Sequence, residues 1–213
     1  MALNNYANLK SSIANWLGRS DLTNEISDFV KLCEQDYNAK LVNNGYSKMI
    51  NLATISADAE TEALPSGFLG INSIYVDSSI KRTLSYITPQ AAFSANLGSK
   101  NGMPLSYTII GNNIHFYPIP DSTYSVKMYY YKQFDTLVND TDTNDVLTNH
   151  PDIYLFGSLY FANTFIRGID PQITAEWLNY YNNALERSVT LNSKHKYNQD
   201  APLQIRSSVS AGI

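Results

Sequence analysis

Apolar side chains recur at helical spacing in two stretches at each end of the chain. These stretches cover residues 3–17 and 20–41, and then residues 150–168 and 170–191. Their apolar positions are Tyr6, Leu9, Ile13, Trp16, Leu17, Leu22, Ile26, Phe29, Val30, Cys33 and Tyr37, and then Ile153, Phe156, Tyr160, Phe161, Ile173, Trp177, Tyr180, Tyr181, Ala184 and Leu185. Intervals of three and four residues predict amphipathic helices, each with one apolar face. The two hairpins must pack together to bury these faces, so residues 1–43 and 150–191 are predicted to form a four-helix body, with Trp16 and Trp177 in its core.

Local signals set the limits of the predicted helices. Gly18 supplies a left-handed end for the first helix, and Ser20 or Asp21 is expected to cap the second. Pro151 and Pro171 stand at first helical positions, where an amide would have no partner within the helix. The tight turn near Gly18 makes the first two helices antiparallel neighbours.

Residues 44–149 lie between the two helical regions and have the pattern of a β-rich insert. Alternating apolar and polar positions predict strands at residues 48–55, 71–76 and 82–86. Thr88 and Pro89 are expected to begin a short helix that reaches about Asn96. The insert is therefore predicted to form a subdomain of its own.

The clearest β pattern lies in the second half of the insert. Strands at residues 107–110 and 114–117 flank Gly111-Asn112-Asn113, a turn typical of hairpins. A third strand follows from Val126 to Tyr131, and we predict an antiparallel three-stranded meander with one face buried. The polar residues 132–149 are predicted to form a long loop back to the helices.

Helical periodicity stops at Asn192, and residues 192–213 are predicted to form an extended carboxy-terminal arm. The predicted fold class is α+β. It combines a four-helix body from the N- and C-terminal hairpins with an inserted antiparallel β subdomain and this extended tail.

Composition favours a protein that contacts other proteins. Only 16% of the residues are charged, against roughly 25% in average proteins, and 16 are tyrosines, which suit protein interfaces. The net charge of −4 and the absence of Lys/Arg clusters argue against a nucleic-acid-binding surface. The sequence has no signal-peptide pattern and no apolar run near the roughly 20 residues that span a bilayer, so we expect a cytoplasmic protein without membrane contact.

No set of residues has the spacing of a cofactor or metal site. His115, His150 and His195 are scattered along the chain, and the single Cys33 lies on an apolar stripe where a buried thiol is expected. The glycines do not form a phosphate-binding loop, and Ser158 lacks the surroundings of a nucleophile elbow. We expect no cofactor, no metal and no catalytic residue.

One stretch matches the first half of a calcium-binding loop. Asp140, Asp142 and Asn144 have the spacing of its first three ligands. The sixth and twelfth positions require Gly and Glu, but Asp145 and Pro151 stand there. We therefore interpret the stretch as a solvated acidic loop.

Three tyrosines follow one another in the last predicted strand of the insert. Successive strand residues point to opposite faces, so at least one of Tyr129, Tyr130 and Tyr131 is expected to be exposed or in a contact. Tyr129 and Tyr131 share a face and are candidates for an interface with another subunit or with the tail described below.

Several short motifs together resemble the head-to-tail adaptor proteins of tailed bacteriophages, of the gatekeeper or tail tubular protein A-like kind. They are Tyr6-x2-Leu9-x3-Ile13-x2-Trp16-Leu17, Arg19-Ser20-Asp21-Leu22-x3-Ile26-x2-Phe29-Val30, Leu64-Pro65-Ser66-Gly67-Phe68, Gly102-Met103-Pro104-x2-Tyr107-x3-Gly111-x2-Ile114-x3-Pro118-x-Pro120 and His150-Pro151-Asp152-x-Tyr154-Leu155. The resemblance covers the chain to about residue 190.

The resemblance implies a structural virion protein at the head-tail junction, made in the cytoplasm of a bacterial host. Members form a dodecameric ring under the portal and line the channel through which the genome is ejected, so DNA passes without specific binding. The carboxy-terminal tail contacts the portal, and we place candidate contacts at Tyr197, Pro202, Leu203, Ile205 and Arg206. The β insert would face outward or toward the nozzle or tail tube.

Two alternatives stay open. Some tail-junction proteins are associated with cell-wall hydrolysis, for which Glu25, Glu34 and Glu176 are the carboxylates to test. The chain could instead be a monomeric protein-binding module that uses its tyrosine-rich sheet.

Overall fold

The computed structural model describes residues 3–95, 97–163, 165–166, 168 and 170–196. Its helices are α1 (Tyr6–Leu17), α2 (Thr23–Asn43), α3 (Pro89–Ser94), α4 (Asp145–Asn149), α5 (Pro151–Ala162) and α6 (Pro171–Lys196), with short 3-10 turns η1 (Ser47–Met49) and η2 (Leu97–Ser99). Its strands are β1 (Ile50–Ala57), β2 (Thr61–Ala63), β3 (Phe68–Val76), β4 (Arg82–Thr83), β5 (Ser85–Tyr86), β6 (Ser106–Ile110), β7 (Asn113–Tyr117) and β8 (Tyr124–Lys132). The α+β class is therefore confirmed.

Helix α5 is the centre of the helical part. It contacts α1, α2, α4 and α6, and most of its surface is buried. Gly157 allows α5 to approach α2 and α6 closely, because a methyl group there would lie 2.9 Å from a ring carbon of Tyr181 and closer still to the Cys33 sulfur. The four long helices were predicted, but the short helix α4 within the predicted loop 132–149 was not.

The strands form two sheets, in the orders β1-β8-β3-β4 and β2-β7-β6-β5. Strand β8 pairs along its length with β1 and also with β3, whereas β7 pairs with β6 and β2. The β6–β7 hairpin is confirmed, but the predicted three-stranded meander is wrong. Both β7 and β8 have an apolar face, and these faces are buried by stacking two sheets around Ile114, Phe116, Val126 and Met128 rather than by placing the strands side by side.

Three limits of the predicted elements differ in the structure. The second helix begins after Leu22 without a side-chain cap, because Asp21 pairs with Arg19 instead (2.6 Å), and Ser20 is not the capping residue either. The predicted strand 82–86 is divided between the two sheets at Leu84, which is buried. Gly18 and Thr88 do cap helices α1 and α3 as predicted.

The helical region after residue 150 also differs at both of its ends. Helix α5 ends at Ala162 rather than near Gly168. Helix α6 continues to Lys196, five residues past the predicted end at Leu191. Asn192, within this extension, accepts a hydrogen bond from the Ser47 amide (2.8 Å), and this contact holds the last turns of α6 against the start of η1.

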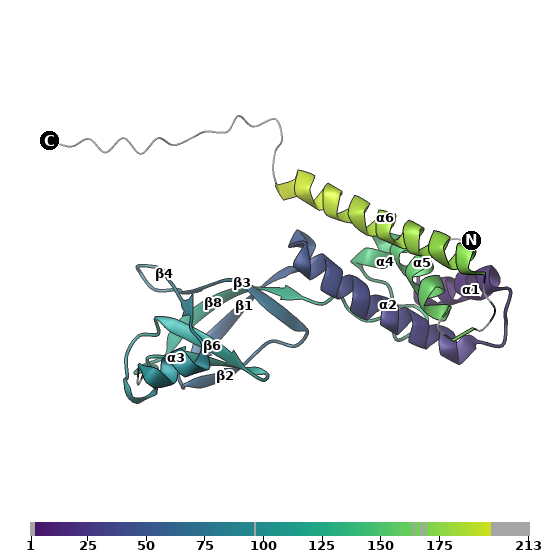
Figure 1. Ribbon diagram of the computed structural model, residues 1–213. Coiled ribbons are helices and arrows are strands. Elements are labelled where there is room, and N and C mark those ends of the chain that lie inside the picture. The colour runs from purple at the N-terminus through teal and green to yellow at the C-terminus, as the bar shows by residue number, and fades with distance from the viewer. Residues whose placement is uncertain (1–2, 96, 164, 167, 169, 197–213) are drawn as a thin grey trace.

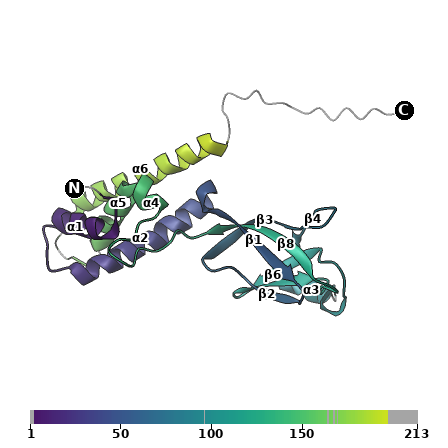
Figure 2. The ribbon, with the colours of Figure 1, turned by 180° about the vertical axis from the view of Figure 1, so that it is seen from behind.

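Helices gather at one end of the molecule and strands at the other (Figure 1), and the view from behind shows the same separation (Figure 2). Each end has its own cluster of buried apolar side chains. The chain crosses between them twice, after α2 through η1 and after β8 through residues 133–144. The exact division at residues 43, 44, 149 and 150 stays a prediction.

A buried polar network holds the second crossing on the helices. The Glu34 carboxylate on α2 accepts hydrogen bonds from the Leu137 amide (3.0 Å) and the Tyr154 hydroxyl (2.9 Å). The Tyr154 hydroxyl also accepts a bond from the Asn144 side-chain amide (2.6 Å) and shares one with the Tyr37 hydroxyl (2.8 Å). Burial raises the pKa of Glu34, Tyr37 and Tyr154.

A second contact of the same kind lies one turn along α2. The Asn38 side-chain oxygen accepts the Phe134 amide (3.1 Å). At the other end of the crossing, Asn144 caps α4 through the Leu147 amide (2.9 Å) and donates to the Asp135 carbonyl (2.8 Å). Side chains of α2 and α4 therefore satisfy backbone groups of a segment that has no strand partner of its own.

The two tryptophans have different environments. Trp177 is 7% exposed in the helical core, but Trp16 is 54% exposed, so its predicted place in the core is wrong. The buried face of α1 is centred on Leu9, Ser12 and Ile13, and Trp16 stands at its edge in the last turn.

Replacing Trp177 by Ala should destabilise the protein by about 3–5 kcal/mol, because a large buried ring is lost. Trp16→Ala is the matched control and should cost less than half as much, because half of its surface is already in water. Urea unfolding followed by circular dichroism measures both. Equal losses in the two variants would contradict the burial described above.

Glu34→Gln should keep both hydrogen bonds and remove the charge, whereas Glu34→Ala should cost about 1–3 kcal/mol for each unsatisfied donor. The pKa of Glu34 is raised in the folded state, so the stability of the wild type relative to Glu34→Gln should fall as pH rises from the unfolded value near 4.5 through the folded value. Urea unfolding of both proteins at pH 4 and pH 7.5 tests this. A difference that is constant, or that grows in favour of the wild type with pH, would be inconsistent with burial of an ionisable Glu34.

Candidate interaction surfaces

The calcium-like loop is held together without a metal ion. Asp140 pairs with Lys10 of α1 (2.7 Å), and Asn144 belongs to the buried network. The Asp142 carboxylate accepts the amides of Val138 (2.9 Å) and Asn139 (2.7 Å), and these bonds lower its pKa. Within the part of the chain that the structure describes, no group of three acidic, His or Cys side chains could hold a metal.

The carboxylates considered for hydrolysis lie apart in function and surroundings. Glu34 is buried and occupied by the Leu137 and Tyr154 donors, Glu25 is half-buried on α2, and Glu176 is exposed on α6. Five hollows of the surface are lined by at most one carboxylate each, Asp140 or Glu186. These hollows do not provide the carboxylate pair that glycoside hydrolysis uses.

Cys33 is fully buried between α2 and α5, where its thiol donates to the Ile153 carbonyl (3.4 Å). Burial raises its pKa. A thiol in this setting is neutral and inert, as expected from its place on the apolar stripe.

Tyr129 and Tyr131 lie on the face of β8 that points away from the sheet-to-sheet core. Both are half-buried. The ring of Tyr129 lies 6.4 Å from that of Tyr75 on β3, beside Leu52 of β1, which is 54% exposed. Tyr131 accepts a hydrogen bond from Asn72 (3.2 Å) and packs partly against the helical core. Tyr129, Tyr75 and Leu52 therefore form the accessible part of this face.

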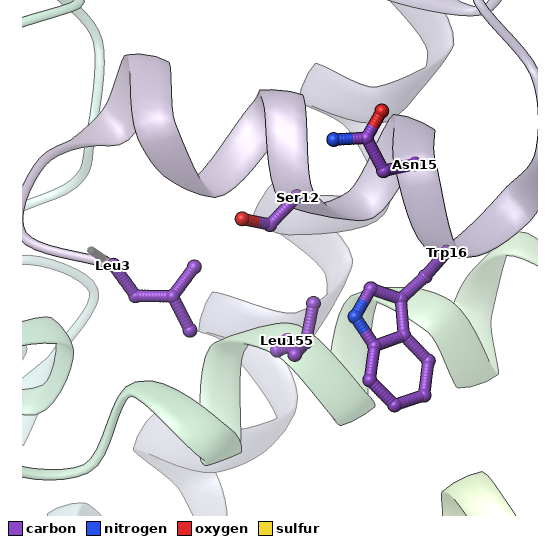
Figure 3. A pocket seen from close by; sticks show the side chains of 5 residues that line it. All are labelled: Leu3, Ser12, Asn15, Trp16 and Leu155. Atoms are coloured by element: carbon purple, nitrogen blue, oxygen red, sulfur yellow. The ribbon is translucent and has the colours of Figure 1, made fainter. Parts of the chain in front are cut away.

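A larger aromatic surface lies on the helical part. The Trp16 and Phe156 rings meet edge to face at 5.6 Å, and Phe156 and Tyr180 lie 4.9 Å apart. Trp16 and Tyr180 are 54% and 50% exposed. The three residues come from α1, α5 and α6, and we call them the aromatic ridge. Beside it, Leu3, Ser12, Asn15 and Leu155 line a hollow next to Trp16 (Figure 3).

The helices of the aromatic ridge carry few charges. Helix α1 has Lys10, α5 has Asp152, and the first fifteen residues of α6 have Glu176. Helix α2, by contrast, carries Glu25, Asp28, Lys31, Glu34, Asp36 and Lys40. Aromatic enrichment with charge depletion is the composition of an interface core.

Sequence reasoning did not find this surface, since Trp16, Phe156 and Tyr180 all fit the helical stripes. A usable signal was present: Tyr180 and Tyr181 are adjacent on one helix, so both cannot point into the core. Tyr181 is buried and donates to Asp36 (2.6 Å), which leaves Tyr180 outside.

The candidate portal contacts Tyr197, Pro202, Leu203, Ile205 and Arg206 lie outside the described residues. Over the residues that the structure does describe, no helix combines the length and apolar character that crossing a membrane requires.

Comparison with known proteins agrees with the resemblance seen in the sequence. No curated protein sequence matches the chain. The family model described as SU10 adaptor protein matches residues 4–206, which is nearly the whole chain. The chain therefore belongs to the SU10 adaptor protein family, a family of phage head-to-tail adaptors.

Proposed function

We propose that the protein is a structural adaptor that forms a ring, expected to be a dodecamer, between the portal and the tail of a phage and lines the DNA exit channel. Family membership supports the adaptor role and a place in the virion. The aromatic ridge is the observation that carries self-assembly, because a single chain leaves Trp16 and Tyr180 half in water.

The energetics suit a closed ring better than an isolated pair. Burying the exposed halves of Trp16 and Tyr180 stabilises a contact by about 1–1.5 kcal/mol each, which is small against the entropy lost on association. In a closed ring every subunit has two such contacts, and closure makes the last contact intramolecular. Assembly on a portal, which gathers subunits, is therefore expected to be stronger than assembly of the free chain.

Electrostatics are compatible with a DNA channel. The net charge is −4, so counterion release would supply little affinity for the phosphate backbone. A channel that is weakly repulsive lets DNA pass without being held.

The remaining surfaces are assigned to the neighbours of the ring. The carboxy-terminal residues Tyr197, Pro202, Leu203, Ile205 and Arg206 are proposed to contact the portal. The tyrosine face with Tyr129 is proposed to contact the nozzle or tail tube, with Tyr131 at its inner border.

Trp16→Glu should abolish or strongly weaken ring formation, because a charge would be buried at the subunit contact. Phe93→Glu is the matched control: Phe93 is 86% exposed on α3, in the other part of the molecule, and should leave ring mass unchanged. Light scattering of each protein, alone and with the portal from the same genome, gives the mass, and circular dichroism checks folding. A wild type that stays monomeric with the portal would favour the monomeric binding module instead.

A chain that ends at Lys196 should fold normally but fail to attach to the portal. The truncation keeps the Asn192–Ser47 contact that a cut at residue 192 would remove. Co-sedimentation with the portal measures attachment. Attachment equal to that of the full chain would exclude the proposed arm.

A further inference from the structure

Strand β1 is an open edge without the usual protection. It ends the sheet order β1-β8-β3-β4, and the opposite edge strand, β4, is only two residues long. Among the described residues, the backbone hydrogen bonds of residues 51–57 run to β8 alone. The sequence Ile-Asn-Leu-Ala-Thr-Ile-Ser-Ala contains no charge and no proline, the features with which natural edge strands avoid pairing with other chains. An edge of this kind is suited to accept a further strand.

The carboxy-terminal segment leaves the helices close to this edge. Asn192 near the end of α6 binds the Ser47 amide, and Ser47 lies three residues before β1 begins. Both views show the end of α6 on the side from which the sheets extend (Figures 1 and 2). Residues 197–202 could span about 20 Å and β1 is about 26 Å long, so a segment that follows them can reach any part of the edge.

The sequence of this segment has the period of a strand. Leu203, Ile205 and Val209 alternate with Gln204, Arg206 and Ser208. Strand β1 alternates in the same way, with Ala53, Ile55 and Ala57 toward the sheet-to-sheet core and Leu52 and Thr54 outward. A strand beside β1 could thus extend the apolar row inward and place Arg206 in solvent.

We propose that residues 203–209 pair with β1 of the same chain in the free protein and add a fifth strand to this sheet. The chain leaves α6 at the end of the sheet where β1 begins, so the direct course is parallel to β1. A parallel pair is slightly weaker than an antiparallel one, which suits a contact that can be exchanged. Leu203, Ile205 and Arg206 cannot contact β1 and another protein at once, so the pairing would protect the edge from self-association and store the arm until a partner displaces it.

Hydrogen exchange of the free chain tests the proposal without any portal, so its outcome is separate from that of the adaptor function. Alternate amides of residues 51–57 should exchange at least tenfold faster in the chain that ends at Lys196 than in the full chain. Amides of β6, which has strand partners on both sides, should be unchanged. Equal exchange of β1 in both proteins would overturn the proposal.

Two further comparisons identify the occupant. Ile205→Pro removes a backbone donor inside the segment and should reproduce the truncation, whereas Ala211→Pro, outside residues 203–209, should not. Protection of β1 should be independent of protein concentration. Protection that increases with concentration would mean that a second copy supplies the strand, and it would overturn pairing within one chain.

Discussion

The contact of Glu34 with Leu137 and Tyr154 fixes how the two parts of this molecule are joined. The chain returns from β8 to α5 through a segment that lacks a strand partner, so its amides need acceptors elsewhere. Helix α2 supplies them from Glu34 and Asn38, and Asn144 holds the other end. Because these groups are buried, loss of one partner leaves others unsatisfied, and the junction is held as a unit. A body that must transmit position from head to tail requires a junction of this kind.

With the crossing held in place, the helical part presents two unlike surfaces. Helix α2 carries the charges, and the faces of α1, α5 and α6 carry the aromatic ridge with few charges. The difference has a local cause, because α5 is buried on nearly every side and exposes Phe156 only between Trp16 and Tyr180. Such asymmetry gives a subunit one face suited to a neighbour and one suited to water, which a ring subunit needs.

Much of the fold follows from local patterns in the sequence. The helices, the β6–β7 hairpin and the caps at Gly18 and Thr88 depend on residues close in the chain, and they were predicted correctly. The sheet order was not, because the pairing of β8 with β1 joins residues more than seventy positions apart, as in Ile50 with Tyr131. Exposure of Trp16 was also missed, since a stripe gives the direction of a side chain but not where the packing partner ends. The polar network was invisible for a similar reason: Glu34 has the sequence context of an ordinary surface residue, and its burial comes from Leu137 and Tyr154.

The central claim is that the aromatic ridge becomes buried when the adaptor assembles. Iodide quenching of tryptophan fluorescence tests this directly in a Trp177→Phe variant, in which Trp16 is the remaining tryptophan of the two. In the free monomer Trp16 should be quenched readily, and on the portal it should become protected. Quenching that stays the same after stable attachment to the portal would contradict the account, because the ridge would then face solvent in the assembly.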